Sequence, residues 1–331
     1  MILIWIKRVL WSLLALVVLL YLLVIGTYHF SNYRYLATLE AGSELVETEQ
    51  GVIEFSRIGE QGPTILVLHG TPGGYDQGMI IGERLESSGF SILAVSRPGY
   101  LRTPGSSGET IDEEVASYLA LMDALNIEQV ALIGGSGGAP SAFAFAAQYP
   151  ERVWAVVQLF GLSGSIPDED SVVYEPSFSE HLIDIFFGET FEYWVLLQIA
   201  GLFPEQTLLA EGMGMVNSDT RNRVLEDTGK LEIFKRMMWT SYPLERVNGQ
   251  NNDVHKFIKL DQSDAASLEI PTLFVHGTDD SNAPYENARF LANSIEEAEF
   301  ITLEEGDHWI FISRPEDFVP EVIEFLSLNA P

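Results

Sequence analysis

Short apolar runs alternate with longer helical patterns along most of this 331-residue chain. The apolar runs are rich in Val, Ile, Leu and Phe and end at Gly, Pro or charged residues, as buried strands do. They lie at residues 64–69, 91–96, 129–133, 153–159, 272–276 and 299–303. The helical patterns lie near residues 77–87, 112–125, 139–148, 287–294 and 315–328. This alternation predicts an α/β fold in which crossover helices flank a mostly parallel central sheet.

The alternation stops between residues 163 and 262, where acidic turns and aromatic-rich helical patterns replace it. Because no Pro-, Gly- or Ser-rich linker bounds this interval, we expect a helical cap inserted after the sixth core strand. A second independent domain is the alternative. The core then comprises residues 36–162 and 263–331, and residues 52–58 are expected to form an antiparallel strand at the edge of its sheet.

Residues 9–28 contain no charged side chain. A helix of this length extends about 30 Å, the thickness of the hydrocarbon layer of a bilayer. We therefore expect residues 1–35 to form an uncleaved transmembrane anchor, with a cleaved signal peptide or a helix of a soluble core as alternatives. Lys7 and Arg8 precede the span and favour an N-terminus in the cytoplasm, with the rest of the chain outside the cell membrane.

Four aromatic residues lie at the C-terminal end of this span, namely Tyr28, Phe30, Tyr33 and Tyr35. Tyr and Trp rings concentrate at the interfaces between membrane and water. We therefore expect these four rings to form an aromatic belt at the interface opposite Lys7 and Arg8.

The composition excludes several functions. The chain contains no Cys, which excludes disulfides, a Cys nucleophile and thiolate metal sites. Its formal net charge of −30 and the lack of a basic stripe argue against nucleic acid as a partner. No nearby His pair at metal-ligand spacing accompanies Asp279 and Asp280, so we expect no metal site there. No other cofactor is expected. The acidic side chains are expected to solvate the surface, and an acidic cluster that binds a cationic substrate group is the alternative.

Residues 134–138 read Gly-Gly-Ser-Gly-Gly and contain the pattern G-x-S-x-G. The pattern follows a predicted strand and precedes a predicted helix, which is the setting of a nucleophile elbow. Small neighbours permit a sharp turn at Ser136, and the helix N-terminus places partial positive charge near a developing anion. Ser136 is therefore the candidate nucleophile. A phosphate-binding loop is the alternative, but the segment lacks the Lys and the spacing of such loops.

A second Gly-rich turn, HGTPGG at residues 69–74, follows the predicted strand at 64–69. Such a turn can aim a backbone N–H group into a site at the end of the sheet. We expect the N–H groups of Thr71 and Gly137 to form an oxyanion hole. His69 is expected to order the loop rather than transfer protons.

Two further loops supply a candidate acid and a candidate base. Asp279 and Asp280 follow the predicted strand at 272–276, where a carboxylate can orient a histidine. By position alone either Asp qualifies, and a simple turn role is the alternative. His308 follows the last predicted strand, at 299–303, and is the candidate base.

These stretches together resemble the α/β-hydrolase superfamily over about residues 50–328. The matching stretches are HGTPGG at 69–74, SRPGYLRTP at 96–104, GGSGGAPSAFAFAAQYPERV at 134–153, HGTDDSNAP at 276–284 and EEGDHWIF at 304–311. The resemblance implies a catalytic triad of Ser136, Asp280 and His308, because the family acid stands three residues after a Gly and four before a Pro. It also places the loop of Arg97 and Tyr100 beside the floor of the site, in a supporting role.

Two departures narrow the function that the resemblance implies. Dehalogenases and epoxide hydrolases of this fold use Asp where this chain has Ser136, which argues against both activities. Prolyl aminopeptidases share the HG-x-P-G loop but usually carry Trp where this chain has Gly137. The resemblance therefore implies a serine hydrolase that cleaves a small-molecule ester or amide through an acyl-enzyme. An aminopeptidase or amidase with the same triad, and a non-catalytic binding protein, are the alternatives.

Aromatic and Met side chains of the predicted cap are candidates for an apolar substrate pocket. They are Phe186, Phe187, Tyr193, Trp194, Met237, Met238 and Trp239. The alternative is that most of them form the core of the cap itself.

Overall fold

The central feature of the fold is a single eight-stranded sheet, seen in a computed structural model of the chain. The structure describes residues 2–59, 61–166, 185–188, 190–205, 216–261, 265 and 267–331. The strands are β1 (Glu44–Thr48), β2 (Gly51–Ile58), β3 (Thr64–Leu68), β4 (Ser91–Val95), β5 (Val130–Gly135), β6 (Val153–Leu159), β7 (Thr272–Gly277) and β8 (Glu299–Leu303). Their spatial order is β1-β2-β4-β3-β5-β6-β7-β8.

The sheet is parallel from β4 to β8, and β1 and β2 add an antiparallel edge. The predicted strand at 52–58 is β2 and is antiparallel as expected, but it does not lie at the edge, because β1 pairs along its outer side. The register places Leu68 beside Gly134, so the chain leaves β3 and β5 at the same edge of the sheet.

Helices cover both faces of this sheet. They are α2 (Tyr75–Glu86), α3 (Ile111–Ala124), α4 (Ala139–Gln148), α11 (Tyr285–Ser294) and α13 (Val319–Asn329). Side chains of one strand alternate between the faces. Ile65 and Val67 of β3 accordingly pack in the cluster that contains α2 and α13. Leu66 and Leu68 pack with α3, α4 and α11 on the other face.

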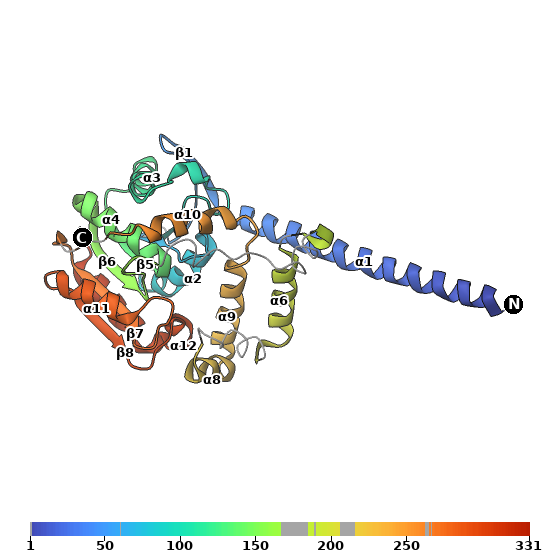
Figure 1. Cartoon of the computed structure of the whole chain (residues 1–331). Coiled ribbons are helices and arrows are strands. Elements are labelled where there is room, and N and C mark those ends of the chain that lie inside the picture. The colour runs from blue at the N-terminus through green and yellow to red at the C-terminus, as the bar shows by residue number, and fades with distance from the viewer. Residues whose placement is uncertain are drawn as a thin grey trace.

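Between β6 and β7 the described chain is helical, as the sequence predicts. It forms α6 (Phe191–Leu202), α8 (Ser218–Glu226), α9 (Thr228–Thr240) and α10 (Val247–Ile258). Helices α6 and α9 lie on the side of the sheet from which α1 extends (Figure 1). Part of the predicted cap, residues 167–184 and 206–215, lies outside the described residues. The cap boundaries at residues 163 and 262 stay predictions.

Helix α1 (Ile2–Ala41) is longer than the expected anchor of residues 1–35 and extends away from the rest of the chain (Figure 1). By length and apolar composition it is a candidate membrane span. Its C-terminal half packs on the cap, so Tyr28 is buried there and Tyr35 is partly buried. Phe30 and Tyr33 are exposed. Only two of the four rings expected in an aromatic belt therefore face away from the protein.

Candidate active site

Ser136 lies in a sharp turn between β5 and α4. Its φ of +47° is left-handed, a conformation that costs a non-Gly residue about 1–3 kcal/mol. A Cβ atom on Gly134 would lie 2.6 Å from the Cα of Ala139, and one on Gly138 would lie 2.2 Å from the carbonyl oxygen of Leu68. The Gly residues around Ser136 are therefore required by the close approach of the turn to β3 and α4.

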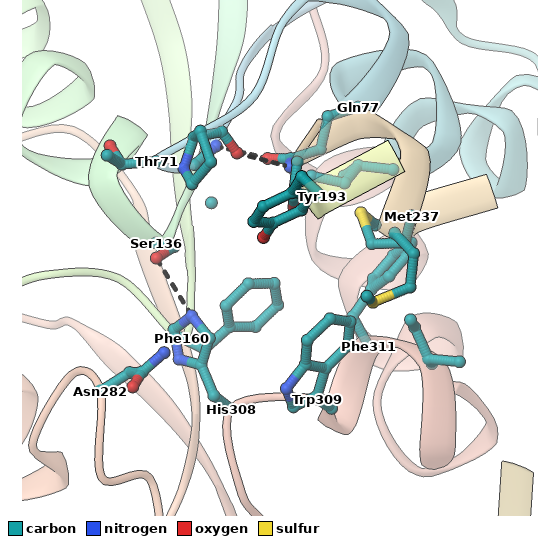
Figure 2. Close-up of a pocket in the computed structure, with 17 residues that line it drawn as sticks. Thr71, Gln77, Ser136, Phe160, Tyr193, Met237, Asn282, His308, Trp309 and Phe311 are labelled. Atoms are coloured by element: carbon teal, nitrogen blue, oxygen red, sulfur yellow. Dashed lines mark hydrogen bonds between the residues drawn. The ribbon is translucent and has the colours of Figure 1, made fainter. Parts of the chain in front are cut away.

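The structure brings the three predicted triad residues together, and Figure 2 shows the contact between Ser136 and His308. The Nε2 atom of His308 lies 3.1 Å from the hydroxyl oxygen of Ser136, and its Nδ1 atom lies 2.8 Å from Oδ2 of Asp280. The three side chains come from loops that follow β5, β7 and β8. These loops meet because parallel strands present their carboxyl ends at one edge of the sheet.

Asp280 is buried and accepts hydrogen bonds at both oxygens. Its Oδ1 atom accepts from the N–H groups of Asn282 and Ala283, each at 2.9 Å. Its Oδ2 atom lies 3.2 Å from Nε2 of His276, a residue that no sequence motif marks for a role in the site. Burial alone would raise the pKa of the Asp280 carboxyl, but the bonds from His276 and His308 hold that pKa well below its usual range.

The other candidate acid, Asp279, lies outside this arrangement. Its side chain is exposed and accepts a hydrogen bond of 3.2 Å from the hydroxyl group of Thr278. The geometry therefore favours Asp280 over Asp279 as the partner of His308, in agreement with the motif count.

Thr71 and Gly137, the predicted oxyanion-hole residues, lie side by side. A Cβ atom on Gly137 would be 2.3 Å from the hydroxyl oxygen of Thr71. The loop that carries Thr71 is held by Gln77, whose Oε1 atom accepts a 2.7 Å hydrogen bond from the N–H group of Gly70. The Thr71 hydroxyl donates to Asp253 of α10 at 2.5 Å. The cap thus contacts this loop directly.

His69 orders the start of the same loop. Its Nε2 atom accepts a 3.0 Å hydrogen bond from the N–H group of Arg97, so the ring proton resides on Nδ1, which lies 2.7 Å from the carbonyl oxygen of Gly70. Burial, and then the charge of Arg97, lower the pKa of His69 well below its usual value. His69 is therefore neutral, as its expected structural role requires.

A buried ion cluster lies beneath the loop and was not predicted as a unit. Arg97 contacts Glu114 of α3 at 2.9 Å and Asp253 of α10 at 2.5 Å, and Lys256 contacts Glu114 at 2.5 Å. Tyr100 donates its hydroxyl proton to Asp253 at 2.6 Å. Burial alone would raise the pKa of Glu114, but the charges of Lys256 and Arg97 hold it well below its usual range. The cluster joins the core to the cap.

A cavity of about 210 Å³ lies above Ser136 and His308 (Figure 2). Its walls combine the core with α6 and α9 of the cap. The lining residues are Gly70, Thr71, Pro72, Gln77, Ile81, Gly135, Ser136, Phe160, Tyr193, Met237, Met238, Ser241, Asn282, His308, Trp309, Phe311 and Ile312. Among these described residues there is no Asp, Glu, Lys or Arg.

The structure places the predicted pocket residues in two groups. Tyr193, Met237 and Met238 line the cavity. Phe186, Phe187, Trp194 and Trp239 do not belong to its lining. Three of those four rings pack against Tyr residues of α1, in the pairs Tyr21–Phe187 at 5.4 Å, Tyr28–Trp194 at 5.7 Å and Tyr35–Trp239 at 5.2 Å between ring centroids. They face α1 because its C-terminal half covers this side of the cap.

The core also contributes aromatic side chains to the cavity, which the sequence pattern does not predict. Phe160 follows β6, and Trp309 and Phe311 follow β8. The ring of Phe160 meets that of His308 edge to face at 5.2 Å. The EEGDHWIF stretch contained Trp309 and Phe311, but nothing in its pattern distinguished a cavity wall from a core position.

A family model described as alpha/beta hydrolase fold matches residues 63–315. The chain belongs to this family. The alpha/beta hydrolase family and fold expected from the sequence are therefore confirmed.

Two relatives and one solved structure illustrate what this alpha/beta hydrolase is similar to. An uncharacterized hydrolase of Bacillus subtilis, YcgS, is 28% identical over 285 residues, which cover 82% of this chain and 93% of the relative. A 2-hydroxy-6-oxononadienedioate/2-hydroxy-6-oxononatrienedioate hydrolase of Paraburkholderia phymatum is 25% identical over 300 residues, which cover 88% of this chain and 95% of the relative. An alpha/beta hydrolase fold protein from Nakamurella multipartita matches with a TM-score of 0.71 and 27% identity, covering 86% of this chain and 98% of that one.

Proposed function

We propose that this alpha/beta hydrolase cleaves a carboxylic ester, with Ser136 as nucleophile, His308 as general base and Asp280 as the acid that orients His308. The observation that carries the proposal is the pair of contacts of 3.1 and 2.8 Å that links the three side chains. Both distances are within the range that proton transfer and orientation require.

In the proposed reaction, Nε2 of His308 accepts the Ser136 proton while the serine oxygen bonds to the ester carbonyl carbon. The N–H groups of Thr71 and Gly137 then stabilise the oxyanion. When the tetrahedral intermediate collapses, the alcohol leaves with the proton from His308. His308 then deprotonates a water molecule, which attacks the acyl-enzyme carbonyl, releases the acid and restores Ser136. In both halves of the reaction, ionised Asp280 stabilises the imidazolium.

The lack of Asp, Glu, Lys and Arg in the described lining of the cavity supports an uncharged substrate. The described lining lacks acidic side chains, so the amine of an aminopeptidase substrate would have no carboxylate partner there. Among the described residues of the cap, Asp253 is the buried carboxylate, and Arg97 already pairs with it at 2.5 Å. We therefore favour a neutral ester over a substrate with a free amine.

Cleavage of a carbon–carbon bond is the second candidate, and the name of the relative from Paraburkholderia phymatum supports it. That name specifies a dicarboxylate substrate. The described lining of the cavity in this chain contains no Lys or Arg to pair with carboxylates. This difference favours ester cleavage for the present chain.

We also propose that α1 anchors the hydrolase to a cell membrane. Its uncharged residues 9–28 match the hydrocarbon thickness, and Lys7 and Arg8 favour a cytoplasmic N-terminus with the catalytic part outside. The interval 163–262 is proposed to act as the cap over the active site.

The test measures hydrolysis of p-nitrophenyl butyrate by the full-length protein in detergent. Ser136→Ala is expected to lower kcat by about 10⁴-fold or more, because nucleophile and base act as a unit. Ser141→Ala is the matched control, since this buried hydroxyl has no hydrogen-bond partner among the described residues. Equal rates for Ser136→Ala and the unmodified protein would refute the proposal.

Two further measurements separate the alternatives. A fluorophosphonate probe should label Ser136, and absence of labelling would favour a non-catalytic binding protein. The ratio of kcat/KM for butyrate esters to that for the dienedioate named above should exceed one. The reverse ratio would favour carbon–carbon cleavage.

A further inference from the structure

One face of α1 packs on the rest of the chain along half of the helix, mostly on the cap and, at Leu39, on α2 of the core. Six residues, spaced alternately by four and three positions, make this contact face, namely Tyr21, Ile25, Tyr28, Asn32, Tyr35 and Leu39. The face begins at Tyr21, whose hydroxyl donates a 2.7 Å hydrogen bond to the carbonyl oxygen of Phe186. It ends at Leu39, whose carbonyl oxygen accepts a 2.6 Å bond from the hydroxyl of Tyr75.

This contact face overlaps the stretch that must cross the membrane. The uncharged stretch is residues 9–28, yet the cap already contacts α1 at Tyr21 and buries Tyr28. Seven residues of helix correspond to about 10 Å along the axis. A span of the same length that ended at Tyr21 would draw Lys7 and Arg8 about 8 Å into the hydrocarbon, where charged side chains are unfavourable. If residues 9–28 cross the membrane, Lys7 and Arg8 stay in water. The cap residues beside Tyr21 then lie at the depth of the bilayer interface.

The side chains on that edge are apolar and exposed. Ile185 and Phe186, next to Tyr21, are 67% and 59% exposed. On α6, Ile199 and Leu202 are 44% and 74% exposed. The sequence of α6 contains a single charged residue, Glu192, in its first turn. Apolar side chains exposed beside a membrane-spanning helix are typical of segments that lie in the interface.

We propose that residues 185–188 and α6 form a membrane-docking edge that inserts into the lipid–water interface of the bilayer that α1 spans. The partner is the lipid surface itself, and the argument is the continuity of this edge with α1 at Tyr21 (Figure 1). The inference rests on the proposed anchor but not on the proposed ester chemistry. Because Tyr193 of α6 lines the cavity, the docking edge and the substrate site share one helix.

The absence of Cys from the chain permits a direct test by single-cysteine spin labelling. Phe186→Cys and Leu202→Cys, each with a nitroxide label, are reconstituted as full-length protein in phosphatidylcholine vesicles. Leu14→Cys reports the N-terminal half of the span, and Ser87→Cys, exposed at the end of α2, reports water. Collisions with oxygen, which concentrates in lipid, are compared with collisions with a water-soluble nickel chelate.

The ratio of oxygen to nickel collisions at residues 186 and 202 is expected to exceed that at residue 87 by at least about three-fold, as for side chains in the interface. Ratios equal to that at residue 87, with a lipid-like ratio at residue 14, would overturn the docking edge but leave the anchor. A water-like ratio at residue 14 would overturn both. Ester hydrolysis by each labelled variant is measured in parallel, so that failure of the ester proposal remains distinguishable.

Discussion

At the scale of single residues, the site depends on how closely two loops approach each other. Gly137 has no room for a side chain, because a Cβ atom there would lie 2.3 Å from the Thr71 hydroxyl oxygen and 3.2 Å from the ring of Phe257. The proposed oxyanion hole, formed by the N–H groups of Thr71 and Gly137, therefore depends on Gly at position 137.

Gly137→Ala is expected to lower kcat for ester hydrolysis by about 10²–10³-fold, the cost of displacing one oxyanion-hole donor. Gly201→Ala in α6 is the matched control, because a Cβ atom there would have nothing within 4 Å. Steady-state kinetics of the two variants check the prediction. A Gly137→Ala variant with unchanged kcat would argue against this oxyanion hole.

Asp253 is expected to be essential for stability. Asp253→Asn leaves the buried Arg97 guanidinium with Glu114 as its one remaining carboxylate partner and gives the ion cluster a net positive charge, which should lower the free energy of unfolding by about 3–5 kcal/mol. Asp123→Asn is the control, because its salt bridge with Arg152 at 2.9 Å lies at an exposed aspartate and should contribute at most about 1 kcal/mol. Urea denaturation measures both, and equal losses would contradict the assigned role.

At the scale of elements, the buried ion cluster joins α3 of the core to α10 of the cap. Glu114 on α3 receives Arg97 on one oxygen and Lys256 of α10 on the other, at 2.9 and 2.5 Å. The cap is therefore attached to the core beneath the Thr71 loop by charge as well as by apolar packing.

The free energy of unfolding should consequently fall as the pH falls below about 5. The pKa of Glu114 is lower in the folded chain than its unfolded value of about 4.3, so the unfolded chain binds the proton more readily. The stabilisation is complete above the unfolded pKa and is lost as pH falls toward the folded pKa. Urea denaturation between pH 7 and pH 3 should show a shallower decline for Glu114→Gln, and parallel declines would contradict the prediction.

At the scale of the whole molecule, α1 serves both as the proposed anchor and as part of the folded cap. Tyr28 and Leu39 are buried against the rest of the chain. The hydroxyl of Tyr35 accepts a 2.8 Å hydrogen bond from Arg246, which also donates to the carbonyl oxygen of Gly73 at 2.5 Å. Arg246 thus links α1 to the loop that carries Thr71 through two hydrogen bonds.

Two truncations should therefore behave differently. A chain that begins at Ile25 retains the contacts of Tyr28, Tyr35 and Leu39, and we expect it to fold and hydrolyse a soluble ester. A chain that begins at Gly42 loses these contacts, which should lower the free energy of unfolding by at least about 4 kcal/mol, counting two buried side chains and two hydrogen bonds. Thermal denaturation compares the two, and equal stability would show that α1 is only a tether.

The sequence by itself determined the parallel sheet, the family and the positions of Ser136, Asp280 and His308. These features are mostly local, because a short apolar run marks each strand and a candidate triad residue follows within a few positions of its end. The choice of Asp280 over Asp279 came from the family resemblance. The parallel arrangement then brings the strand ends to one edge.

Only the tertiary structure decided which side chains form the walls and supports of the site. Asp253 meets Thr71 across 182 positions of the chain, and Trp239 packs on Tyr35 instead of in the cavity. A hydrophobic pattern specifies that such side chains are buried but not against what, since contacts between distant segments depend on how complete elements pack.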